Sequence, residues 1–459
     1  MAFNVLTSTA TELSRLLARR EVTAVELTKA YLEQIRKHNK AGAHLNAIIS
    51  VVPEEQLLET ASKLDQERAE GRVRSPYHGI PFVVKDNIWT AASFGLPTTC
   101  GAWALKEAKA KNNADVVQAV LNGWLQGVWR LHRLFGGWRT PAGSSSGSAI
   151  AAAVGMAPFA LGTETEGSVL QPSDRASLYS IKPTIGKIST RGCLPGIKLT
   201  DVVGPMTKSP EDLAAFLDIL TPIKDVSHVD FLTGAFKDLR IGFLDTKQWL
   251  SGPAIETVNA AIDLVEKSGA KVKRNVALVS SEDDKKFNDL ISNDLRKGFE
   301  EFAEGLDQAP VKTLQELVDF NREHASECLP EGTSDQQYIE DVVKAADLSA
   351  EKYQEYTTTL RLNTGAEGLD AVFRENEIDV LNGPPTGRGT SVAILAGYPV
   401  GTLPLGYARF NGRAFGLTVI APTNAEPLIL RIMSAWDAIV FKRQPPPKLM
   451  SWEADVPEM

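Results

Sequence analysis

The stretch Pro141–Pro183, PAGSSSGSAIAAAVGMAPFALGTETEGSVLQPSDRASLYSIKP, decides the fold of this chain. It contains two Gly/Ser-rich turns, Gly143–Gly147 and Gly162–Ser168. Between the turns, an alanine-rich run predicts a helix and a short apolar run predicts a strand. Each turn presents a serine, and Ser144 and Ser168 are 24 residues apart. We therefore interpret the stretch as loop, helix, strand and loop.

An upstream segment, HGIPFVVKDN, adds a lysine to these serines, because the apolar strand Ile80–Val84 ends directly before Lys85. A serine hydroxyl is a weak nucleophile until a base takes its proton. No histidine lies in either Ser/Gly turn and the chain has no GxSxG motif, so a Ser-His-Asp enzyme is not indicated. Lys85, Ser144 and Ser168 together form a candidate Ser–Ser–Lys hydrolytic centre.

A lysine base must be neutral when it acts, which requires its pKa to fall by about 3 units from roughly 10.4. Burial at the end of an apolar strand would favour the neutral form of Lys85. The alternative is a strand-end lysine that reaches water, which is the commoner case for a lone lysine. Backbone N–H groups of the Gly162–Ser168 turn could converge on an oxyanion, or this segment could be a simple glycine turn.

The composition limits the class of protein. The 459 residues are 43% hydrophobic and 23% charged, which is typical of a globular chain. A net charge of −8 argues against a nucleic-acid-binding surface. The three cysteines, Cys100, Cys193 and Cys328, fit neither a disulfide framework nor a zinc motif. With no secretory signal and no run of about 20 apolar residues, we expect a cytoplasmic protein without stable membrane insertion.

Alternating strand and helix patterns predict an α/β fold, a large mixed β-sheet core flanked by α-helices. We expect one domain over residues 1–441, with the Ser/Lys core in 79–210 and a helical periphery in about 280–375. Residues 442–459 are expected to form an extended tail. One capping-box pair, Thr23 and Glu26, indicates a helix start.

Residues 113–143 are unusual because they contain three tryptophans and three arginines. Within them, Leu121, Leu125 and Val128 begin a helical stripe. Three interpretations of this pattern stay open: a basic amphipathic surface helix, an ordinary half-buried helix, and a sequence that is locally not native.

Several sequence blocks together resemble the amidase signature family, and they cover nearly the whole chain apart from residues 116–139. The blocks are LNAIISV, HGIPFVVKDN, TTCGAWAL, PAGSSSGSA, ALGTETEGSV, IKPTIGKIS, TDVVGPMTKS, AGYPVGTLPLG and FGLTVIAP. The resemblance implies the amidase signature fold and a Ser–cisSer–Lys triad. It implies no metal and no organic cofactor.

The resemblance also assigns roles. It implies that Lys85 is the general base, that Ser168 is the acylated nucleophile, and that Ser144 bridges them after a cis peptide bond. Ser145 matches a serine that supports this network. The backbone of the turn Thr165, Glu166, Gly167 and Ser168 matches the oxyanion hole. Lys85 would take a proton from Ser144 as Ser144 takes one from Ser168, and the relay would then reverse to protonate the leaving amine.

Two features depart from the commonest pattern of the family, whose turn reads Gly-Thr-Asp-Thr-Gly-Gly-Ser. Glu164 replaces the aspartate and Glu166 replaces a glycine, as in a GTETDGS-like branch. Glu166 would repel anionic substrates or point away from the site. The segment 116–139 is shorter than expected and does not resemble the family's core strand, so we expect that strand to be missing.

Four functions follow from these observations. The first is an amidohydrolase that cleaves the C–N bond of a small linear carboxamide. The second is a catalytically impaired or inactive relative, argued from residues 116–139 alone. The third is the glutaminase component of a tRNA-dependent amidotransferase, and the fourth is a carboxylesterase that uses the same triad. The expected partner is a small-molecule amide. The oligomeric state is left open between a monomer and a homodimer, because dimers are common in the resembling family.

Overall fold

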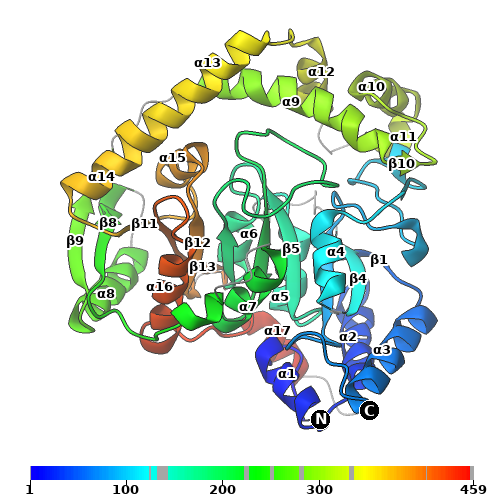
Figure 1. Cartoon of the computed structure of the whole chain (residues 1–459), viewed down its shortest axis with the longest axis horizontal. Coiled ribbons are helices and arrows are strands. Elements are labelled where there is room, and N and C mark those ends of the chain that lie inside the picture. Colours follow the sequence, from blue (N-terminus) through cyan, green and yellow to red (C-terminus); the bar gives the residue numbers. More distant parts are fainter. Residues whose placement is uncertain are drawn as a thin grey trace.

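A mixed sheet of eleven strands runs through the molecule (Figure 1). The computed structural model describes residues 2–123, 126–131, 143–221, 227–248, 253–278, 284–329, 335–409 and 411–454. In spatial order the strands are β1 (Ile48–Val51), β4 (Gln126–Leu131), β2 (Pro81–Lys85), β5 (Phe159–Glu164), β7 (Val202–Thr207), β6 (Tyr179–Lys182), β12 (Val400–Tyr407), β13 (Ala414–Ile420), β11 (Val380–Gly383), β8 (Arg240–Leu244) and β9 (Lys271–Val276). A small second sheet pairs β10 (Leu306–Asp307) with β3 (Lys109–Ala110).

Helices cover the sheet, which confirms the predicted fold class. They are α1 (Ala10–Ala18), α2 (Ala24–His38), α3 (Glu54–Ala69), α4 (Asp115–Asn122), α5 (Ser146–Ala153), α6 (Leu170–Arg175), α7 (Pro210–Leu220), α8 (Pro253–Lys267), α9 (Asp284–Glu304), α10 (Leu314–Glu323), α11 (Ala325–Cys328), α12 (Gln337–Lys344), α13 (Ala350–Arg361), the π-helical segment η5 (Leu362–Leu369), α14 (Asp370–Glu375), α15 (Arg388–Ala396), α16 (Glu426–Ile439) and α17 (Pro447–Ala454). The predicted capping box is present at α2, where Thr23 Oγ1 accepts the N–H of Glu26 at 3.1 Å.

The parallel strands β4, β2 and β5 lie side by side, and β7 continues the sheet in the antiparallel sense. Phe82 and Phe159 face each other in this register and are fully buried. Tyr77 and Phe216 pack on Phe159 with ring centroids 4.9 Å and 4.6 Å away. Burying a side chain of this size contributes about 1.5–3 kcal/mol, so this part of the sheet is a rigid base for the strand ends.

Strand β4 corrects two expectations about residues 116–139. The backbone of 126–131 pairs with β1 on one side and with β2 on the other, so these residues form no helix and the position of a core strand is occupied. The predicted helical stripe was wrong beyond α4, which ends at Asn122. A short apolar run fits both the helical and the strand periodicity. Hydrogen-bonded pairing with β1 and β2 is what makes this run a strand. The other parts of this prediction, at 124–125 and 132–139, lie outside the described residues.

The C-terminal segment is also more ordered than expected, because α17 occupies residues that we expected to be extended. Leu449 in this helix is buried, and Tyr407 Oη donates a hydrogen bond to the carbonyl oxygen of Gln444 at 2.7 Å. The buried Leu449 side chain and this hydrogen bond therefore hold the segment against the body of the protein.

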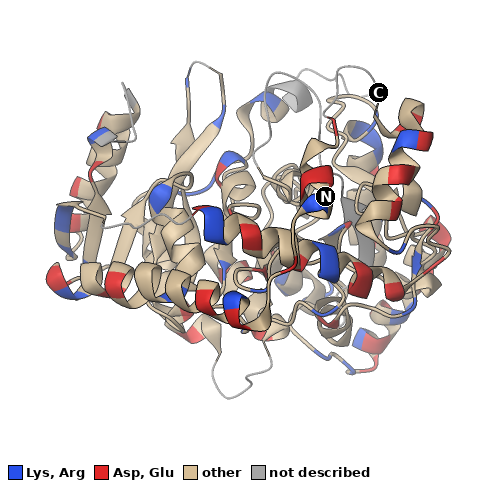
Figure 2. Ribbon diagram, turned by 90° about the horizontal axis from the view of Figure 1, so that it is seen from above, with Lys and Arg blue, Asp and Glu red and all other residues tan. Residues whose placement is uncertain are grey.

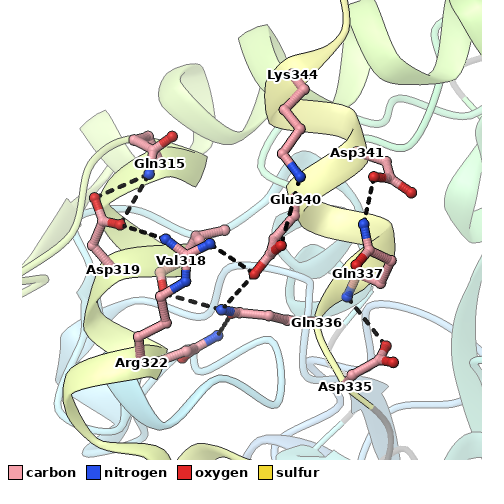
Figure 3. Close-up of polar contacts among 11 residues, drawn as sticks. Gln315, Val318, Asp319, Arg322, Asp335, Gln336, Gln337, Glu340, Asp341 and Lys344 are labelled. Carbon is pink, nitrogen blue, oxygen red and sulfur yellow. Dashed lines mark hydrogen bonds and ion pairs between the residues drawn. The ribbon is translucent and has the colours of Figure 1, made fainter.

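The outer helices carry charges of both signs, while the strands are mostly free of them (Figure 2). Helices α9 and α13 pack side by side along the rim in Figure 1. Beside them, polar contacts join α10 to α12, among them Arg322 Nη2 to Glu340 Oε1 at 2.9 Å (Figure 3). Among the described residues, no helix has both the length and the apolar character that crossing a membrane requires.

Candidate active site

The end of β2 positions Lys85, which is the last residue of that strand. Strand β5 runs parallel to β2 and ends with Thr163 and Glu164, so the carboxyl ends of both strands lie at one edge of the sheet. Lys85 Nζ lies 2.9 Å from Thr163 Oγ1, which also accepts a hydrogen bond from Asn87 Nδ2 at 3.0 Å. The threonine hydroxyl therefore fixes the direction of the lysine side chain.

Ser144 lies next to this lysine, with Lys85 Nζ 2.5 Å from Ser144 Oγ. The backbone N–H of Ser144 points to Ser168 Oγ at 3.4 Å. The structure thus brings Lys85, Ser144 and Ser168 together, with Ser168 Oγ facing the backbone N–H of Ser144, and all three are half-buried. None of the described peptide bonds is cis, so the expectation of a cis bond before Ser144 was wrong for this structure.

Ser145 ties the first Ser/Gly turn to β5. Its Oγ donates to the carbonyl oxygen of Thr163 at 3.1 Å and accepts the N–H of the same residue at 3.2 Å. The N–H of Ser145 donates to the carbonyl oxygen of Ser168 at 3.1 Å. Ser145 thus joins the first turn to β5 and to Ser168 in the second turn.

The second turn closes around the buried carboxylate of Glu164. Its Oε1 accepts the N–H of Gly167 at 2.5 Å, and its Oε2 accepts the N–H groups of Val169 and Leu170, the latter at 3.0 Å. Gly167 has a φ of +82°, a conformation that favours glycine. The carboxylate therefore binds backbone on both sides of Ser168.

Thr165 and Glu166 connect this turn to distant segments. Thr165 Oγ1 donates to Asp201 Oδ1 at 2.7 Å, and Asp201 also accepts the N–H of Gly196 at 2.6 Å. Ser391 in α15 donates to Glu166 Oε1 at 2.7 Å. The side chain of Glu166 is exposed and turned toward α15, while its backbone stays in the turn.

Burial dominates the electrostatics behind the turn. It raises the pKa of Glu164, and three backbone N–H donors together with the charge of Lys182 oppose this shift. Lys182 is itself buried, which lowers its pKa to about 7. Its Nζ donates to the carbonyl oxygens of Tyr398 at 2.8 Å and Pro183 at 3.0 Å. Burial likewise raises the pKa of Asp201 to about 6.

A cavity of about 250 Å³ opens onto Lys85 and Ser144. Thr163, Thr165 and Asp201 line its polar side. Leu194, Pro195 and Leu295 supply apolar wall. The volume suits a small ligand or one end of a longer one. Among the described residues, no group of three or more His, Cys, Asp or Glu side chains is placed to hold a metal ion.

Sequence reasoning missed several of these contacts. Asn87 follows Lys85 within one block, but nothing in the sequence shows that it shares Thr163 with the lysine. Asp201 and Ser391 come from segments far along the chain, so only the fold reveals their contact with the turn. Glu164 was noted as a departure from the family pattern, although its hydrogen bonds could not be read from that substitution.

Comparison with known proteins agrees with this architecture. The solved peptide amidase of Stenotrophomonas maltophilia superposes with a TM-score of 0.87 at 27% identity, over 96% of this chain and 98% of that chain. A Schizosaccharomyces pombe protein, assigned provisionally by its name to the amidases, is 26% identical over 92% of this chain and 84% of its own length. One component of the glutamyl-tRNA(Gln) amidotransferase of Caldanaerobacter subterraneus is 33% identical over 57% of this chain and 58% of its own.

The family profile described as Amidase matches residues 26–123 and 136–430. These two ranges include the end of β2, both Ser/Gly turns and most of the large sheet. The chain therefore belongs to the Amidase family and has the amidase signature fold, and it is a hydrolase that acts on amide C–N bonds.

Proposed function

We propose that the protein is an amidohydrolase that cleaves the C–N bond of a small carboxamide through an acyl-Ser168 intermediate. The observation that carries this proposal is the 2.5 Å contact between Lys85 Nζ and Ser144 Oγ, with the N–H of Ser144 directed at Ser168 Oγ. A neutral lysine in that position can accept the proton of the bridging serine.

In the first half of the reaction Ser168 Oγ attacks the substrate carbonyl carbon. The Ser168 proton passes to Ser144 as the Ser144 proton passes to Lys85, and a tetrahedral oxyanion forms. Backbone N–H groups of the Thr165–Ser168 turn stabilise that oxyanion. The C–N bond then breaks, the amine leaves with the proton returned through Ser144, and Ser168 stays acylated. Water, activated by the same relay, releases the acid.

The size of the cavity and the likeness to peptide amidase guide the choice of substrate. A cavity of about 250 Å³ admits a primary amide and a few neighbouring atoms. The neighbour with a TM-score of 0.87 is a peptide amidase, so peptide amides are the first class to assay. Matched esters of the same acyl groups test whether the leaving group matters, because acyl transfer to a serine does not itself require nitrogen.

The first experiment is intact-protein mass after exposure to a fluorophosphonate, in which Ser168 would displace fluoride. We expect one adduct on the wild type and none on Ser168→Ala. Ser189→Ala is a matched control, because this exposed serine binds Asp115 and does not line the catalytic cavity. Absence of an adduct on folded wild-type protein, or an adduct that survives in Ser168→Ala, would refute the proposal.

The base is tested by Lys85→Ala and by the dependence of the rate on pH. Removing the amine should slow both labelling and amide hydrolysis by at least about 100-fold, the usual contribution of general base catalysis. For the wild type we expect the rate to rise with pH as Lys85 loses its proton. Ordinary turnover by Lys85→Ala, or a wild-type rate that stays flat down to about pH 5, would count against a lysine base.

A further inference from the structure

Glu164 is a buried carboxylate whose hydrogen bonds surround the nucleophile. It is 0% exposed and follows Thr163 at the end of β5. It accepts the N–H of Gly167 on one side of Ser168 and those of Val169 and Leu170 on the other. A charged acceptor forms hydrogen bonds roughly twice as strong as neutral ones, so this contact governs the shape of the turn.

The remaining N–H groups of the turn differ from that of Gly167 in their hydrogen bonding. Within the described part of the chain, the N–H groups of Thr165, Glu166 and Ser168 have no hydrogen-bond acceptor. Gly167, between them, has its N–H directed at Glu164 Oε1 at 2.5 Å. An N–H that already binds a carboxylate is not available to an oxyanion, because both acceptors would need the same proton.

We propose that Glu164 is a positioning residue that shapes the oxyanion hole: it withdraws the N–H of Gly167 and leaves those of Thr165, Glu166 and Ser168 for the substrate. The inference rests on the proposed function and deepens it. A carboxylate is required because all three partners of the side chain are donors, and a carboxylate can only accept. Its length matters too, because the two oxygens reach opposite sides of Ser168.

Lys182 lies close enough to this carboxylate to balance its charge while the lysine is protonated. It is fully buried, and its attraction to Glu164 favours the ionised carboxylate. Its hydrogen bonds, however, go to the carbonyl oxygens of Tyr398 and Pro183. The lysine therefore acts on Glu164 through its electric field, while Pro183, directly after β6, and Tyr398, two residues before β12, hold its amine.

The test compares Glu164→Gln and Glu164→Asp with the wild type by fluorophosphonate inactivation. The phosphoryl oxygen of the probe needs the same N–H donors as an oxyanion. In Glu164→Gln an amide NH₂ would face backbone donors, so we expect kinact to fall roughly 10- to 100-fold, while KI changes less than about threefold. Glu164→Asp keeps the charge but is one methylene shorter, and an intermediate kinact is expected.

Asp212→Asn is the matched control for loss of a buried carboxylate. Asp212 is also 0% exposed and accepts the N–H groups of Ala10 and Thr11, each at 2.8 Å, at the start of α1. We expect this variant to lower Tm without lowering kinact when inactivation is measured well below Tm. If Glu164→Gln does not fold, Glu164→Asp decides by the same comparison.

Three outcomes overturn the proposal. The first is a kinact for Glu164→Gln that equals the wild-type value, the second is an equal change of kinact in Asp212→Asn at a similar Tm, and the third is a change confined to KI. These results are distinct from failure of the proposed function, in which the wild type itself would form no adduct at Ser168.

Discussion

Gly143 shows how closely the two Ser/Gly turns approach each other. Its φ is +82°, and a Cβ there would lie 3.0 Å from the carbonyl oxygen of Gly167 and 3.1 Å from Ser168 Cα. We expect Gly143→Ala to displace the nucleophile and to slow fluorophosphonate labelling, in addition to about 1–2 kcal/mol of backbone strain. The rate of fluorophosphonate labelling measures the displacement of the nucleophile, and the Tm measures the backbone strain.

Gly186→Ala separates these effects. Gly186 has the same φ of +82°, but a Cβ there would meet nothing within 4 Å. This variant should therefore show the strain in its Tm and label at the wild-type rate. Equal labelling by both alanine variants would mean that the contact with Ser168 is unimportant.

At the scale of elements, one buried amide, that of Gln336, connects α10 to α12 through several hydrogen bonds (Figure 3). Gln336 Nε2 donates to the carbonyl oxygen of Val318 and to Glu340 Oε1, and Gln336 Oε1 accepts from Asn321, each at 3.2 Å. Gln336→Ala removes three hydrogen bonds around the buried Val318, so we expect local stability to fall by about 1–3 kcal/mol. Hydrogen exchange of the amides in α10 and α12 measures this change.

Labelling of Ser168 should stay unchanged in that variant, because none of these residues lines the catalytic cavity. Gln337→Ala is the control, since Gln337 is exposed, its side chain donates to Asp341, and its backbone N–H donates to Asp335, a bond that alanine keeps (Figure 3). If exchange in α10 were equally fast in both variants, the buried amide would not be what joins the helices.

At the scale of the whole molecule, buried lysines should make stability depend on pH. Lys208 is 2% exposed, and its Nζ donates to the carbonyl oxygens of Val5 and Ser8. Burial lowers its pKa from 10.5 to about 7. Between these two values the unfolded chain binds more protons than the folded one. The free energy of unfolding should therefore rise with pH, by up to about 1.4 kcal/mol per pH unit for each such lysine.

Lys208→Met should reduce this slope, because the variant has one fewer lysine to deprotonate on folding. Urea unfolding at about pH 7.5 and pH 9.5 measures the slope, with Lys63→Met as the control at an exposed position. Lys182 contributes in the same direction, so part of the slope should persist. A slope equal to that of the wild type would show that Lys208 keeps its proton in the folded state.

The sequence could predict the α/β class and the three candidate side chains, the class from local patterns and the grouping of the side chains from the resemblance to a known family. A strand ending at Lys85 and two glycine-rich turns each need only a few neighbouring residues. The strand at 126–131 could not be predicted in this way. Its short pattern is ambiguous by itself, and pairing with β1 and β2 determined its conformation.

The sequence by itself thus determined the elements, the serines and the lysine, since backbone propensity and side-chain chemistry are local properties. Only the tertiary structure decided what surrounds them. The contacts of Thr165 with Asp201 and of Glu166 with Ser391 join residues 36 and 225 positions apart. Glu164 faces only donors because the turn folds back over it, with Lys182 brought near by the sheet. Burial and distance, which set pKa values and hydrogen bonds, exist only once the chain has folded.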